Sequence, residues 1–326
     1  MNGKMRLVSR ENKMSRRGLI TVGTLGAVGA SPGCGVVAKT IEKGEEDCHE
    51  VASDLSNVPV PKQVDVRERM IETSDARLWC WDTGGSRETI VLCHAFTGSG
   101  ASWVYQQPVF SAAGYRVIGY SRRGYFRSES SADKFPPASE DLDRLVNACG
   151  IDRFHIIGTA AGAGVAADYA LSHPEKLHSL IMASGIISLQ DKLIAEVYPR
   201  LVPPDLAGLP ADFRELGPSY RAVNPEGTRL WLDLERNART VAKPAAASAN
   251  VVTLDKLAAL QVPTFLLSGE CDLYMPAGLL FRVAEQMPAA RVAAIRHAGH
   301  SAFWEQPTVF NRLVLDFMAS SALRAR

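Results

Sequence analysis

The sequence has none of the short motifs that mark a bound metal ion, phosphate group or dinucleotide. Its six cysteines are not paired at metal-ligand spacing, and it has neither a phosphate-binding loop nor a dinucleotide fingerprint. Acidic and basic residues nearly balance, with a net charge of +1, so the charge gives no indication of a nucleic-acid partner. We therefore expect no metal, no cofactor and no nucleic acid.

A hydrophobic run long enough to cross a membrane is also missing from the N-terminal region. The apolar segment at residues 18–30 has thirteen residues, whereas a membrane-spanning helix needs about 20. We therefore expect no integral membrane span.

Residues 1–30 nevertheless have the order of regions that is typical of an export signal. Six basic residues and one acidic residue precede the apolar segment, which ends in small residues at 28–30. The run at residues 15–20 contains the pair Arg16 and Arg17 and resembles a twin-arginine signal. We expect the protein to be exported, either to the periplasm or out of the cell. A short buried or interfacial helix with a basic start is the alternative.

Residues 31–63 are polar and mixed in composition, and we expect them to form a leader or a surface segment. Cys34 near their start is a candidate for a lipid anchor, although residues 31–33 fit the sequence of a lipobox poorly. Cys34 and Cys48 could also form a disulfide in an oxidising compartment. The sequence leaves both possibilities open.

From residue 64 onward, short apolar runs alternate with amphipathic segments. This alternation predicts an α/β fold with a mostly parallel, doubly wound sheet. Segments 64–72 and 76–82 are expected to pair as strands. Further strands are predicted at 89–93, 115–120, 154–157, 180–183, 262–268 and 291–295, and helices at 102–113, 139–149, 163–171, 254–260, 279–286 and 309–323. Ser139 is expected to cap the helix that it begins.

The alternation stops in residues 185–250, where seven prolines separate short amphipathic pieces. We interpret this segment as a helical cap that divides the core into residues 64–184 and 251–326. Two aromatic residues of the cap, Tyr198 and Trp231, could line a substrate pocket or pack inside the cap itself.

The turn at residues 158–162 carries the clearest chemical signal. A short apolar strand runs into a helix through the sequence Gly-Thr-Ala-Ala-Gly, which is the setting of the nucleophile elbow G-x-S-x-G. The spacing of the two glycines is kept, but Ala160 stands at the centre. An alanine methyl group cannot attack a carbonyl carbon, so the usual nucleophile is missing.

Three loops, each after a predicted strand, make the sequence from about Val64 to the C-terminus similar to the α/β-hydrolase superfamily. They are the loop at 94–100, the acidic turn at 269–272 and the histidine loop at 299–301, which is followed by Phe-Trp-Glu-Gln-Pro at 303–307. The resemblance implies the α/β-hydrolase fold with a helical cap.

The resemblance also implies a set of site residues. The family order of nucleophile, acid and histidine falls on Ala160, Asp272 and His300. The backbone N–H groups of Phe96 and Ala161 would form the oxyanion hole. In such a site the histidine moves protons near neutral pH, and the carboxylate fixes the histidine tautomer.

The loop after the predicted strand at 115–120 departs from the family pattern. Ser121 stands where the family usually has an acidic residue. Arg122, Arg123 and Arg127 follow, and they either bind an anionic group of the substrate or form a solvated cluster. His94 is expected to be a structural hydrogen-bonding residue at the base of its loop, with a place in the substrate pocket as the alternative.

Three functional hypotheses are compatible with Ala160. In the first, His300 and Asp272 act as a general base on water or on the substrate, which would be a small, mostly apolar carbonyl compound such as an ester or lactone. This arrangement suits hydrolysis, and equally carbon–carbon cleavage, elimination or cofactor-free oxygen chemistry, so the enzyme is expected to be a hydrolase or a lyase. In the second, Ala160 replaces the serine of an ordinary esterase or lactonase. In the third, the site is a non-catalytic pocket for a small apolar ligand. We favour an enzyme, because a pure binding protein does not need a paired imidazole.

Overall fold

The structure is a computed structural model that describes residues 57–130, 135–186, 189–202, 204–241 and 247–324. The predicted export signal, Cys34, Cys48 and most of the 31–63 segment lie outside these residues. Within the described ranges, no helix combines the length and the apolar character needed to cross a membrane.

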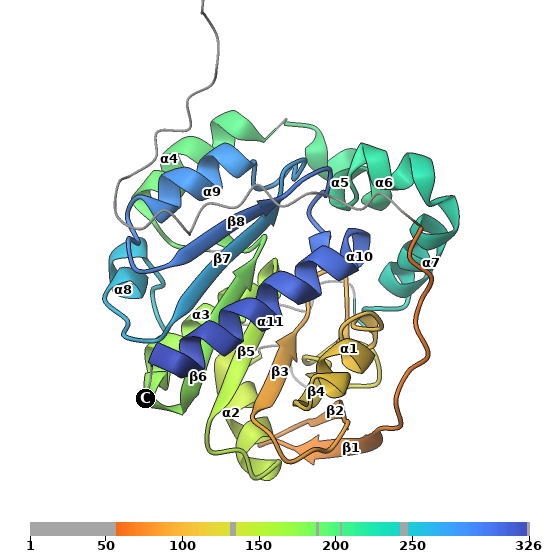
Figure 1. The fold of residues 1–326 in the computed structure, drawn as a ribbon, viewed down its shortest axis with the longest axis vertical. Coiled ribbons are helices and arrows are strands. Elements are labelled where there is room, and N and C mark those ends of the chain that lie inside the picture. The colour runs from red at the N-terminus through yellow and green to blue at the C-terminus, as the bar shows by residue number, and fades with distance from the viewer. Residues whose placement is uncertain (1–56, 131–134, 187–188, 203, 242–246, 325–326) are drawn as a thin grey trace, which may run out of the picture. The chain divides into compact units, whose positions relative to one another are not determined.

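Eight strands form one sheet in the order β1-β2-β4-β3-β5-β6-β7-β8 (Figure 1). The pairs β1–β2 and β2–β4 are antiparallel, and all other neighbours are parallel. This mostly parallel sheet confirms the predicted fold class. The strands are β1 (Arg67–Glu72), β2 (Arg77–Asp82), β3 (Thr89–Cys93), β4 (Arg116–Tyr120), β5 (Phe154–Thr159), β6 (Leu177–Ala183), β7 (Thr264–Gly269) and β8 (Arg291–Ile295).

Helices connect the strands and supply the cap segment. The helices of the core are η1 (Gly100–Ser102), α1 (Gln107–Ala112), α2 (Ala138–Ala148), α3 (Ala161–Ser172), η2 (Pro174–Lys176), α8 (Leu254–Ala258), α9 (Ala277–Ala284), α10 (Ala302–Glu305) and α11 (Pro307–Arg324). Between β6 and α8, the cap segment forms α4 (Lys192–Leu201), η4 (Leu206–Gly208), α5 (Ala211–Glu215), α6 (Pro218–Val223) and α7 (Pro225–Arg236). In Figure 1 the arrowheads of β7 and β8 point toward α5 and α6.

The sheet separates two hydrophobic cores. Val91 and Cys93 of β3 belong to the core that includes residues of α2, α3 and α9. Ile90 and Leu92 belong to the other core, with residues of α1 and α11. Successive side chains of a strand point to opposite faces, so an apolar run such as β3 is buried on both sides. Figure 1 shows α11 crossing the near face of the sheet.

Two local predictions are wrong. Ser139 does not cap α2, because the N-cap residue is Pro137 and the Ser139 hydroxyl donates instead to the Asp168 carboxylate at 2.6 Å. The helix predicted at 102–113 is divided into η1 and α1. Pro108 accounts for the division, because proline lacks an N–H group and is tolerated in the first turn of a helix but not in its interior.

Candidate active site

The turn between β5 and α3 has the strained backbone of a nucleophile elbow. Ala160 has φ 49° and ψ −118°, a conformation that costs a non-glycine residue about 1–3 kcal/mol. The two flanking glycines are packed against backbone. A Cβ atom at Gly158 would collide with the carbonyl of Gly162, and one at Gly162 would collide with the carbonyl of Cys93. The elbow backbone is therefore kept, with a methyl group at its centre.

His300 and Asp272 form a hydrogen-bonded pair after the carboxyl ends of β8 and β7. The His300 Nδ1–H group donates to Asp272 Oδ1 at 2.9 Å and to Oδ2 at 2.8 Å. The carboxylate is fixed in turn, because the N–H groups of Tyr274 and Met275 donate to Oδ1 and the Ser268 hydroxyl donates to Oδ2. With Nδ1 engaged as a donor, Nε2 of the neutral ring is the proton acceptor.

The three predicted catalytic positions lie at one edge of the sheet. Ala160, Asp272 and His300 follow the parallel strands β5, β7 and β8, and the carboxyl ends of parallel strands share an edge. Open α/β sheets bind their ligands at this edge.

The surroundings of His300 are acidic and almost free of solvent. The residue is 6% exposed, and the Tyr274 ring packs against it with 4.5 Å between ring centroids. Burial alone lowers the pKa of His300, but the charges of Asp272 and Glu215 outweigh burial and raise the pKa to about 9. Among the described residues, no group of three His, Cys, Asp or Glu side chains could hold a metal ion.

Glu305 joins the cap to the histidine loop. Its carboxylate accepts the N–H group of Gly217, in the cap, at 2.7 Å and that of Gly299, beside His300, at 2.9 Å. Burial raises the pKa of Glu305 to about 8, although these N–H groups lower it. The sequence placed Glu305 behind the histidine and gave it no role.

Glu215, the last residue of α5, is the acidic neighbour that the sequence did not indicate. Its backbone carbonyl accepts the N–H group of Ser301, the residue after His300, at 3.0 Å. The residue is 5% exposed, and its Oε2 atom has no hydrogen-bond partner among the described residues. No local pattern could have identified it, because its burial depends on where the cap docks.

The two N–H groups predicted to form the oxyanion hole remain unused within the described part of the chain. Neither the Phe96 nor the Ala161 N–H group donates a hydrogen bond there. Ala161 is the first residue of α3, where the N–H groups have no intrahelical partner and the helix dipole favours an anion. The Phe96 side chain is 42% exposed, and the Arg239 guanidinium lies 4.9 Å from its ring centroid.

His94 and Ser121 hold the loop at 94–100 through backbone contacts. His94 Nδ1 donates to the carbonyl of Ala95 at 2.7 Å, and Nε2 accepts the N–H group of Arg122 at 3.0 Å. The Ser121 hydroxyl accepts the N–H group of Gly100 at 3.1 Å. Burial, and then the charge of Arg122, lowers the pKa of His94 well below its usual value. Both ring nitrogens are thus engaged by backbone, which is the arrangement of a structural histidine.

The three arginines after β4 are bound to protein groups. Arg123 is buried in an ion pair with Asp141, and Arg127 pairs with Glu68 at the surface. Arg122 donates to the backbone carbonyls of His94 and Ala95. The sequence predicted either a solvated cluster or a site for an anionic substrate group. Arg123 fits neither prediction, because it is buried and its charge is paired with Asp141.

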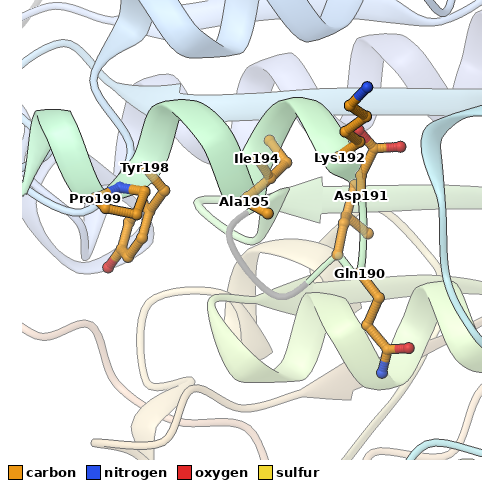
Figure 2. Close-up of a pocket in the computed structure, with 8 residues that line it drawn as sticks. Gln190, Asp191, Lys192, Ile194, Ala195, Tyr198 and Pro199 are labelled. Atoms are coloured by element: carbon orange, nitrogen blue, oxygen red, sulfur yellow. The ribbon is translucent and has the colours of Figure 1, made fainter.

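The two aromatic residues of the cap have different surroundings. Trp231 is buried in a hydrophobic core that also contains Leu216 and Trp304. Tyr198 lines a pocket of about 380 Å³ along α4 and the segment before it (Figure 2). None of the predicted catalytic residues lines this pocket.

The nearest candidate nucleophiles do not replace the missing serine. Cys93 is buried in β3, and burial raises the pKa of its thiol to about 12, which disfavours the reactive thiolate. The Ser99 hydroxyl is engaged in capping η1, where it accepts the N–H group of Ala101. Thr159 is buried at the end of β5.

The parallel sheet, the strained turn after β5 and the His–Asp pair at one sheet edge define the α/β-hydrolase-fold class. Residues 88–307 match the family described as alpha/beta hydrolase fold, and the chain belongs to this family. The predicted superfamily is thereby confirmed.

Individual relatives are hydrolases of small compounds. The chain is 25% identical over 287 residues to 2-hydroxy-6-oxo-6-phenylhexa-2,4-dienoate hydrolase of Burkholderia cepacia, covering 82% of this chain and 99% of the relative. A thermophilic esterase from Thermogutta terrifontis has a similar structure, with a TM-score of 0.66 and 22% identity over 78% of this chain and 99% of that one. The enol-lactonase from Burkholderia xenovorans LB400 also has a similar structure, with a TM-score of 0.61 and 20% identity over 75% of this chain and 97% of that one. The prediction of an enzyme of this superfamily, a hydrolase or a lyase, is confirmed by the sequence relatives, which are hydrolases.

Proposed function

We propose that the protein hydrolyses small, mostly apolar carbonyl compounds of the ester or lactone type, with a water molecule in place of the serine hydroxyl. The proposal is carried by the contact between His300 Nδ1 and both Asp272 oxygens, at 2.8 and 2.9 Å, which leaves Nε2 as a proton acceptor. The relative from B. cepacia supports a small carbonyl compound as the substrate, since its named substrate carries an oxo group.

In this mechanism, His300 Nε2 takes a proton from water while the water oxygen adds to the carbonyl carbon of the substrate. Asp272 stabilises the imidazolium that forms. The N–H groups of Phe96 and Ala161 stabilise the negative oxygen of the tetrahedral intermediate. The bond to the leaving oxygen then breaks, and His300 returns the proton to that oxygen. The Ala160 methyl group leaves space for the water, because it lacks the hydroxyl oxygen of serine.

The arginines support a mostly apolar substrate. Arg122, Arg123 and Arg127 are engaged by carbonyls or by acidic residues of the protein. They therefore do not offer a free cationic group that would select an anionic substrate.

One observation favours the second hypothesis, an esterase or lactonase whose serine is replaced. The φ of 49° at Ala160 is a strained conformation that presents a nucleophile in this family, and an alanine gains nothing from it. This alternative predicts that restoring the hydroxyl restores ordinary serine catalysis.

A screen of aryl esters and lactones with the wild type, His300→Ala and Ala160→Ser tests both functions. Loss of wild-type turnover in His300→Ala, with no gain in Ala160→Ser, is the result expected for the water mechanism. A gain of about 10³-fold or more in Ala160→Ser supports the replaced serine, since loss of such a serine costs about 10⁶ in kcat. If neither change alters anything except ligand affinity, the protein is a binding protein and the proposal fails.

A further inference from the structure

The proposed mechanism makes no use of Glu215, although this carboxylate belongs to the surroundings of His300. Its negative charge raises the pKa of His300, and among the acidic residues only the charge of Asp272 has a larger effect. Its own backbone carbonyl is hydrogen-bonded to the residue after His300. The cap thus brings a second carboxylate to the His–Asp pair.

The position of Glu215 is fixed by a close contact between backbones. Gly217 lies so near Gly299 that a Cβ atom on either residue would meet backbone atoms of the opposite segment at 3.0 Å or less. Glu305 accepts the N–H groups of both glycines and holds the two segments together. Glu215, two residues before this contact, therefore has little freedom to turn toward solvent.

Burial raises the pKa of Glu215, and the charge of Arg214 and the contact with the Tyr274 side chain offset this only in part. Arg214 itself makes its hydrogen bonds to other groups. Arg214 donates to the carbonyl of Leu209 at 3.0 Å and to the hydroxyl of Tyr274 at 2.9 Å. Glu215 Oε2 is left buried with no hydrogen-bond partner among the described residues. A buried carboxylate oxygen without a donor has lost its hydrogen bonds to water and gained none from the protein, so it is expected to take a donor when one is available.

We propose that Glu215 is a substrate-binding residue whose carboxylate accepts a hydrogen bond from a hydroxyl or amine group of the substrate beside His300. This inference rests on the proposed hydrolase function and narrows its substrate class. Asp272 and Glu215 make the surroundings of His300 acidic, so a substrate carboxylate placed there would be repelled. The favoured substrate is an ester or lactone that carries a neutral or cationic donor near the scissile bond.

The test uses three probe lactones: γ-butyrolactone and its α-hydroxy and β-hydroxy derivatives. Each is assayed for kcat/KM, or for Ki against the best ester of the screen where turnover is slow. The wild type is expected to prefer one hydroxylated lactone by about 10-fold or more, as for a hydrogen bond to a charged group. Glu215→Leu is expected to remove this preference, and Glu215→Gln, which keeps an acceptor oxygen, to retain part of it.

Glu226→Gln is the matched control, because Glu226 is an exposed residue of the same cap, in α7, with a side chain 80% exposed. It is expected to keep the wild-type preference. An unchanged preference in Glu215→Leu, or a wild type that prefers or binds neither hydroxylated lactone, overturns the proposal. His300→Ala distinguishes failure of the Glu215 proposal from failure of the proposed hydrolase function. If His300→Ala abolishes turnover of the unsubstituted lactone or of aryl esters, the hydrolase function stands and only the role of Glu215 is refuted.

Discussion

The imidazole of His300 contacts both carboxylate oxygens of Asp272, with Nδ1 at 2.9 Å from Oδ1 and 2.8 Å from Oδ2. The carboxylate cannot easily rotate away, because two backbone N–H groups and one hydroxyl also donate to it. The orientation of the ring is therefore set by the protein before a substrate arrives.

Asp272→Asn is expected to reduce kcat by up to about 10⁴, as in a serine protease whose triad aspartate is replaced. The asparagine amide can present an N–H group to Nδ1, which favours the wrong histidine tautomer. Steady-state kinetics with the best substrate of the ester and lactone screen measures the effect. Ser268→Ala, which removes one donor to the carboxylate, should cause a much smaller loss. A kcat close to the wild-type value in Asp272→Asn would contradict a catalytic role for the pair.

The acidic surroundings of His300 predict alkaline activity. The neutral ring is the active base and the pKa is raised to about 9, so kcat/KM should rise with pH and level off only above about 9. An unperturbed histidine would level off above about 6.5. A pH profile of kcat/KM measures the midpoint, and a midpoint near the unperturbed value would refute the predicted shift.

The stability of the fold should change with pH in the opposite direction. The folded state holds the His300 proton more tightly than the unfolded chain does, so the ion pair contributes fully below about pH 6.5. This contribution is lost as the pH rises through the folded pKa of about 9. Urea unfolding at several pH values measures it, and His300→Ala should remove this part of the pH dependence.

Glu305→Ala is expected to destabilise the protein and loosen the cap. The buried N–H groups of Gly217 and Gly299 would lose their acceptor, and each unsatisfied donor costs about 1–3 kcal/mol. Glu305→Gln keeps one acceptor oxygen and should lose less. Chemical denaturation of both variants measures the difference, and equal stability of Glu305→Ala and the wild type would show that the carboxylate does not hold the two segments.

Export is our proposal from the N-terminal sequence, and it is tested by replacing Arg16 and Arg17 with lysine. The change keeps the charge but removes the arginine pair that a twin-arginine translocon recognises. In a bacterium with this translocon, the doubly substituted protein should stay inside the cell while the wild type is exported. Fractionation followed by immunoblotting measures the distribution, and an identical distribution of the two proteins would exclude the twin-arginine route.

Much of the fold could be predicted because its signals are local. The strands predicted at 89–93 and 291–295 begin and end at the same residues as β3 and β8, because the pattern of apolar side chains reports burial directly. The start of α2 was misplaced because Ser139 has the side chain of a cap residue but points inward to Asp168. A cap preference is a local tendency, and here a tertiary hydrogen bond overrides it.

The sequence by itself determined the order of strands and helices, the glycine spacing around Ala160 and the family to which they point. Each of these depends on residues close together in the chain. Only the tertiary structure decided that Arg123 is buried against Asp141, that His94 is held by backbone and that Glu215 lies beside His300. These contacts join segments that are far apart in sequence. The burial and the charged partners of Arg123, His94 and Glu215 therefore depend on which distant segment packs against each residue.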